Sequence, residues 1–273
     1  MRGVLACLLM LAMGAAHAEG GETIRWMLTG VPPKFVVDGP FRGQGYGEQQ
    51  VAFLSQRLPQ FEHKVELVTP ARLWHEMQAE RGICSIDIAY LPERDAWAVF
   101  SRRLTSIPTY RLLVMKEREP EFAEFLDAQG QVDLDRLGAS ERFTGIYVTG
   151  RHYMTEINAF IESPTRKMRI DSMSASTKIF EMVAGRRGDF SFANVTEMNY
   201  FNALNAAAPP GAKALPVLTT LPIKSSSAQV HGHIACSRDP LGRQMMQAID
   251  KLLDDDRTWA EFSAPEQRWL AER

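Results

Sequence analysis

The sequence lacks an excess of charge of either sign. It has 31 Lys and Arg residues against 33 Asp and Glu residues, a formal net charge of −2, and no long basic block. Binding to a phosphate backbone depends on clustered Lys and Arg. The composition therefore argues against a nucleic acid as partner.

Low-complexity tracts are also absent. With 45% hydrophobic and 23% charged residues, the chain has the composition of an ordinary globular protein. Its 273 residues suit one large domain or two smaller ones, and either can bury a core without a metal or a disulfide.

Apolar runs long enough to cross a bilayer are missing. The run from Val4 to Met13 is about half the roughly 20 residues that a spanning helix needs. It follows Arg2 and precedes the small residues Ala16 and Ala18, which is the pattern of a Sec-type signal peptide. We therefore expect cleavage after Ala18 and export to the periplasm, without stable membrane insertion.

Cysteine is scarce, with three in the chain. Cys7 ends a stretch that resembles a lipoprotein cleavage box, but the apolar run would then lie on the wrong side of the cleavage site. Once the signal peptide is removed, Cys84 and Cys236 remain. In an oxidising compartment an isolated pair favours a disulfide, and two buried free thiols are the alternative.

The first part of the chain alternates strands and helices. Apolar patterning predicts strands over 24–28, 65–67 and 83–90, and helical spacing predicts helices over 48–58 and 71–80. Strands that alternate with helices of this length are typical of parallel βαβ units. The pattern predicts an α/β protein.

A second unit repeats this order. Its predicted strands and helices are 110–115, 144–148, 150–160, 168–170, 176–184 and 189–193. The charged stretch 116–137 between them is predicted to be helical and solvated. An apolar strand over 230–236 follows, and then a helix that Asp239-Pro240 caps and a last helical segment.

A series of short motifs accompanies these elements. They are Pro32-Pro33, Gly45-Tyr46-Gly47, Pro92-Glu93-Arg94, Phe100-Ser101, Gly145 to Gly150, Ala184-Gly185-Arg186 and Asp189 to Phe192. The ordered series resembles the periplasmic solute-binding proteins of family 3, the group of polar amino-acid binding proteins. The resemblance covers residues 22 to about 265, and it is closest to a divergent branch of that family.

This resemblance implies a two-lobed type II periplasmic-binding-protein fold, with the second lobe inserted in the first through two hinge strands. Lobe 1 would comprise residues 19–110 and 228–273, and lobe 2 residues 111–227. Both remaining cysteines would then lie in lobe 1. The implied function is capture of a small-molecule solute in the interlobe cleft by a monomer, for an ABC permease or as sensor input, without cofactor or metal.

In lobe 1, the resemblance places Arg94 where the family grips the ligand carboxylate, and a guanidinium pairs bidentately with that planar group. The hydroxyl-bearing residues that precede this arginine in the family are absent here. Asp87 is a candidate ligand contact or pocket-facing charge. Because Val31 replaces the stacking aromatic of the family, the candidate platforms for a planar ligand are Tyr46, Tyr90 and Trp74.

In lobe 2, Thr149, Gly150 and Arg151 form a loop before a predicted helix, where backbone N–H groups favour an anion. Asn194 stands where members of the family usually carry the aspartate that pairs with the ligand ammonium. An amide lacks the charge for that role. Two arginines without a matched acid predict an anionic or neutral solute and not a zwitterionic α-amino acid, unless Glu197 supplies the acid.

Other chemistries have weaker support. His231 and His233 lie on one face of a predicted strand but lack the further ligand that a metal needs. A module that has lost its solute and binds a protein partner is one alternative. Another is a periplasmic enzyme that resembles cyclohexadienyl dehydratases. Its candidate acids or bases are Asp87, Glu93, His152 and Glu197.

Overall fold

The computed structural model describes residues 21–30, 32–103, 105–106, 108–151, 153–173, 177–225 and 231–271. The predicted signal peptide, Val31 and His152 lie outside these residues. Within them, no helix is both long and apolar enough to cross a membrane.

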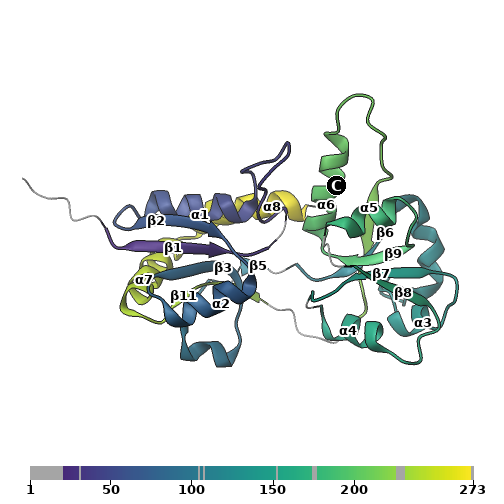
Figure 1. Cartoon of the computed structure of the whole chain (residues 1–273), viewed down its shortest axis with the longest axis horizontal. Helices are drawn as coiled ribbons and strands as arrows, with labels where there is room; N and C mark the ends of the chain where they lie inside the picture. Colours follow the sequence, from purple (N-terminus) through teal and green to yellow (C-terminus); the bar gives the residue numbers. More distant parts are fainter. Residues whose placement is uncertain are drawn as a thin grey trace, which may run out of the picture.

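The described strands form two separate sheets, which Figure 1 shows side by side along the long axis. The first has the order β2-β1-β3-β11-β4, with β5 paired to β11, and the second has the order β10-β6-β9-β7-β8. The strands of the first sheet are β1 (Thr23–Leu28), β2 (Glu62–Leu67), β3 (Ile83–Ala89), β4 (Ala98–Phe100), β5 (Thr105–Ser106) and β11 (His231–Ser237). Those of the second are β6 (Arg111–Met115), β7 (Thr144–Val148), β8 (Arg169–Met173), β9 (Phe190–Ala193) and β10 (Leu218–Leu221). We call the parts built on the two sheets lobe 1 and lobe 2.

Helices cover both sheets. In lobe 1 they are α1 (Tyr46–Arg57), α2 (Pro70–Ala79), the 3₁₀ helix η1 (Pro92–Ala96), α7 (Pro240–Leu253) and α8 (Asp256–Leu270). In lobe 2 they are the 3₁₀ helix η2 (Lys116–Phe125), α3 (Leu134–Gly138), α4 (Thr155–Glu162), α5 (Lys178–Ala184) and α6 (Val195–Ala206). Helices therefore lie on both faces of each sheet, as is typical of parallel βαβ units, although the edge strand β2 stays largely exposed.

The burial pattern of β1 shows how the sequence builds lobe 1. Ile24, Trp26 and Leu28 pack with α1, α7 and α8 on one face of the sheet, whereas Met27 packs with α2 on the other. The alternation follows from the two-residue period of a strand. Lobe 2 has its own pair of cores, one against η2, α3 and α4 and one against α5 and α6.

The chain leaves lobe 1 after β5 and returns to it in β11. β1 pairs in parallel with β2 and β3, whereas β11 runs antiparallel to β3, β4 and β5. Cys84 on β3 lies opposite Cys236 on β11, and the two form a disulfide. The bridge thus joins the strands between which lobe 2 is inserted.

The lobes touch through α6 and the end of α8, which Figure 1 draws in green and yellow. Tyr200 of α6 packs with Val36, Tyr46 and Trp269 of lobe 1. Asn199 of α6 donates from Nδ2 to the carbonyl oxygens of Trp269 and Ala271, at 2.8 and 3.0 Å. This contact fixes the end of α8 on lobe 2.

The predicted α/β class is confirmed, but two helix predictions were wrong and one helix was missed. The stretch 116–137 is not one helix, because Pro120 lacks an N–H and Asp133 caps a new helix, α3. The helix predicted from Gly150 begins at Thr155, since Gly150 has φ +73°. The helix α6 was not predicted at all.

Candidate functional site

An ion pair lies in lobe 2 at the start of α6. Arg151 Nη1 and Nη2 donate to Glu197 Oε2 and Oε1 at 3.2 and 2.9 Å, and the two side chains are 9% and 8% exposed. Glu197 is the third residue of α6 and closes a capping box with Asn194. The helix start therefore holds the carboxylate, and the bidentate geometry cancels both charges.

Two tyrosines surround this pair. The Arg151 guanidinium lies 5.5 Å from the centroid of the Tyr110 ring, and the rings of Tyr110 and Tyr153 meet edge to face at 4.9 Å. Burial raises the pKa of Tyr110 to about 12. Tyr110 thus stays neutral at ordinary pH and provides an apolar ring beside the guanidinium.

A second ion pair lies in lobe 1 at the end of β3. Lys34 Nζ is 3.3 Å from Asp87 Oδ2 and donates to the carbonyl oxygen of Ile86 at 3.0 Å. The side chains of Lys34 and Asp87 are 13% and 6% exposed. This pair, too, is nearly buried and cancels its own charge.

A β-bulge orients Asp87. The pairing of β3 with β11 runs from Ser85–Ala235 to Ile88–His233, so β3 has one residue more than β11 in this interval. Asp87 takes φ +53°, which is uncommon for a residue with a side chain. The extra residue brings its carboxylate to Lys34 and into the electrostatic range of Tyr46.

The carboxylates of both ion pairs affect the pKa of Tyr46. It is the first residue of α1 and is buried in the contact between the lobes. Burial raises its pKa well above the ordinary value, and the charges of Asp87, Glu266 and Glu197 raise it further. The phenol therefore lies within electrostatic reach of carboxylates from both lobes.

Glu266 on α8 is a titratable group that the sequence did not single out. Its side chain is buried, and burial together with the charge of Asp87 raises its pKa to about 8, against a lowering effect of Lys34. A helical position one turn before Trp269 was the only sequence signal, and it does not reveal an acidic neighbour from β3.

Arg94 and Tyr90 lie on η1 and just after β3, with partners in lobe 1. The Arg94 guanidinium donates from Nη1 to the carbonyl oxygen of Ala89 at 2.6 Å and lies 4.4 Å from the centroid of the Trp74 ring. Tyr90 donates from Oη to Asp95 Oδ2 at 2.7 Å. Among the described residues, no contact joins Arg94 to Arg151, so their joint grip on a ligand stays a prediction.

The other lobe 2 candidates have local structural roles. Thr149 donates from Oγ1 to the carbonyl oxygen of Met173 at 2.9 Å. Asn194 Oδ1 accepts from the backbone N–H of Glu197 at 2.9 Å and from Thr196 Oγ1 at 2.7 Å. Gly150 does not open a helix. Their contacts with a ligand also stay predictions.

The pairing of Arg151 bears on the predicted solute. The expectation of an anionic or neutral ligand rested on arginines without a matched acid. Glu197 is that acid for Arg151. Its presence removes the reason to exclude a zwitterion.

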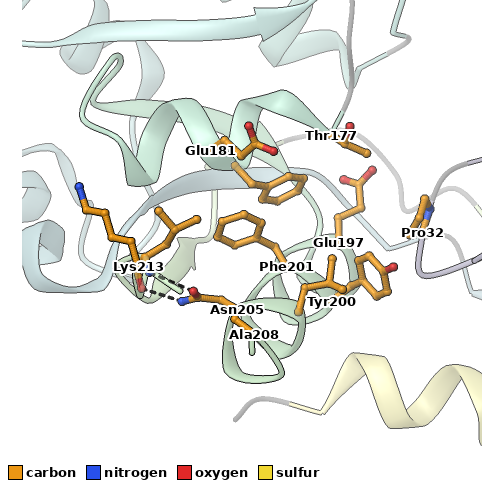
Figure 2. A pocket seen from close by; sticks show the side chains of 12 residues that line it. Pro32, Thr177, Glu181, Glu197, Tyr200, Phe201, Asn205, Ala208 and Lys213 are labelled. Atoms are coloured by element: carbon orange, nitrogen blue, oxygen red, sulfur yellow. Dashed lines mark hydrogen bonds between the residues drawn. The ribbon is translucent and has the colours of Figure 1, made fainter. Parts of the chain in front are cut away.

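A cavity of about 350 Å³ adjoins the ion pair of lobe 2. Figure 2 shows Glu197 and Pro32 at one end and Lys213 at the other. No group of three or more His, Cys, Asp or Glu residues suited to a metal occurs in the part of the chain that the structure describes.

Comparison with known proteins identifies the fold. No family model and no curated protein matches the sequence. Among solved structures, the probable amino-acid ABC transporter extracellular-binding protein ytmK of Bacillus subtilis is 12% identical, with TM-score 0.63, over 92% of this chain and 100% of that chain.

Two streptococcal structures give the same result. A Streptococcus pneumoniae amino acid ABC transporter substrate-binding protein bound to L-arginine is 11% identical, with TM-score 0.59, over 91% of this chain and 93% of the other. A structure from work on glutathione import via GshT and the cystine ABC importer TcyBC of Streptococcus mutans is 12% identical, with TM-score 0.61. The match covers 92% of this chain and 95% of the other. The predicted two-lobed α/β fold of type II periplasmic binding proteins is thereby confirmed.

Proposed function

We propose that the protein is an extracytoplasmic solute-binding protein that captures a small molecule between its lobes. The observation that carries the proposal is a nearly buried ion pair in each lobe: Arg151–Glu197, beside a cavity that Pro32 of lobe 1 also lines, and Lys34–Asp87. Structural neighbours that bind amino acids for ABC transporters support it. The protein would act as a monomer in the periplasm, for an ABC permease or as sensor input.

The electrostatics favour a solute without net charge. Each ion pair is internally compensated, so neither pair offers an excess charge to a buried monovalent ion. A neutral polar molecule or a zwitterion can hydrogen-bond to both pairs without leaving an uncompensated charge. The proposed solute therefore has zero net charge, which differs from the expectation in leaving out anions and in admitting zwitterions.

Binding explains the buried acids better than catalysis does. An enzyme of the dehydratase type needs a carboxyl group that is open to substrate and protonated near neutral pH. Glu266 has the raised pKa, but its side chain is only 3% exposed on the face of α8 that packs against lobe 1. Its burial keeps it from a substrate.

Substitution of Glu197 tests the proposal. Residues 19–273 are screened by thermal shift against neutral, zwitterionic and anionic small molecules, since a ligand at 100 times its dissociation constant stabilises by about 2.7 kcal/mol. The wild type should respond to molecules of zero net charge. Glu197→Gln leaves Arg151 uncompensated, and we expect the response to move to mono-anions, by at least about tenfold in relative affinity.

The control is Glu162→Gln, which removes an exposed carboxylate from α4 in the same lobe. It should bind as the wild type does. A wild type that already prefers anions, or a Glu197→Gln variant with unchanged preference, contradicts the proposal.

A further inference from the structure

The cavity beside α6 is mainly apolar. It lies between α5, α6 and the segment that leads to β10. The rings of Phe180 and Phe201 stack in it, with centroids 5.3 Å apart and an interplanar angle of 20°. Tyr200, Leu204 and Leu215 extend the apolar lining. Figure 2 shows the ring of Phe201 in the middle of the cavity.

Hydrogen bonds hold the wall opposite α6 in place. Asn205 donates from Nδ2 to the carbonyl oxygen of Leu215 at 2.6 Å, and its Oδ1 accepts from the backbone N–H of Leu215 at 2.9 Å. One side chain thus ties the incoming segment to the helix. The cavity is a built feature of lobe 2, with a volume in the range of small-molecule sites.

One end of the cavity belongs to the contact between the lobes. Pro32, from the loop that follows β1 in lobe 1, lines it together with Glu197. Glu197 carries the carboxylate that binds Arg151. A solute whose polar group lies at the ion pair therefore has an apolar space directly beside it.

The opposite end offers a different environment. Lys213 lies there, is exposed, and has no ion-pair partner among the described residues. In Figure 2, Phe201 lies between this lysine and Glu197. The cavity can thus hold a body that is apolar along its length.

We propose that this cavity binds the apolar side chain of the solute, so that the protein selects solutes of zero net charge with an aliphatic or aromatic body. The inference rests on the proposed function, because the polar head of the solute is placed at Arg151–Glu197. Burial of each further methylene in the cavity strengthens binding by about fourfold. Selectivity for length and bulk therefore resides in α5 and α6.

A homologous ligand series tests the inference. The probes are glycine, alanine, norvaline, norleucine and phenylalanine, which share one zwitterionic head, and affinity is measured by titration calorimetry on residues 19–273. The wild type should gain about fourfold per methylene along the aliphatic series. Ala208→Trp places a ring at the cavity wall and should remove this gain.

The matched control is Ala206→Trp, at the exposed last position of α6 and outside the cavity lining. It should keep the full gain. Binding that is equally strong across the series in the wild type overturns the inference and leaves the proposed function intact.

If no member of the series binds, the zwitterionic head is wrong and the cavity is probed by itself with 1-anilinonaphthalene-8-sulfonate. Dye binding that Ala208→Trp abolishes and Ala206→Trp preserves supports an apolar ligand site. Equal dye fluorescence in the wild type and both variants overturns it.

Discussion

Glu266 lies on α8 with its carboxyl group buried near Asp87, Lys34 and Tyr46. Its pKa of about 8 in the folded protein, against 4.5 as the ordinary value, means that the folded state binds more protons than the unfolded state between these limits. Stability must therefore fall as the pH rises from about 4.5 to 8.

Glu266→Gln removes this titration. We expect the melting temperature of the variant to depend less on pH between 5 and 8, and at pH 8 to exceed that of the wild type by about 5 °C. Differential scanning calorimetry across this range measures both. Glu261→Gln, an exposed acid on the same helix, is the control, and parallel curves for the wild type and Glu266→Gln contradict the prediction.

At the level of single residues, sequence analysis found Asp87, Tyr46, Arg151 and Glu197, because the family resemblance and the charge or ring of each side chain pointed to them. It did not find their pairing. The partner of Asp87 is Lys34, which is far away in sequence, and a bulge in β3 sets the direction of the carboxylate. Neither the distant partner nor the bulge produces a periodic pattern in the sequence.

At the level of elements, α6 shows why one helix escaped prediction. It has neighbours on several sides, so its apolar residues follow no single stripe. Three asparagines of α6 each form hydrogen bonds with a different neighbouring segment. Asn199 bonds to the end of α8, Asn202 to Leu218 of β10, and Asn205 to Leu215. The roles of these asparagines can be assigned only after the fold is known.

Asn199 and Asn202 make a matched pair for testing the contact between the lobes. Asn199→Ala leaves two carbonyl oxygens at the end of α8 without their donor. This should lower the free energy of unfolding by about 1–3 kcal/mol. We expect a lower melting temperature, faster amide hydrogen exchange near Trp269 and a larger radius of gyration in small-angle scattering.

Asn202→Ala removes hydrogen bonds of the same kind, but within lobe 2. It should lower the melting temperature without changing hydrogen exchange in α8 or the radius of gyration. Identical scattering and exchange for the two variants would show that the α6–α8 contact does not hold the lobes together.

For the whole molecule, the strand and helix order in the sequence was enough to predict the α/β class, and the ordered motifs led to the two-lobed fold. The contact between the lobes could not be predicted, because it joins α6, the loop before α1 and the end of α8 from distant parts of the sequence.

The disulfide acts at this largest scale, because the segment between Cys84 and Cys236 contains all of lobe 2. A cross-link over a long segment stabilises mainly by restricting the unfolded chain, typically by 2–4 kcal/mol, about 5 at most. We expect the double variant Cys84→Ala/Cys236→Ala to have a free energy of unfolding that is lower by about that much. It should unfold first in lobe 1, where both cysteines are fully buried.

Hydrogen exchange followed by peptide mass analysis should therefore show faster exchange in β3 and β11 than in β6 and β9, whose cores contain no cysteine. Equal acceleration in both lobes would mean that they unfold as one unit, and an unchanged melting temperature would mean that the bridge contributes nothing to stability.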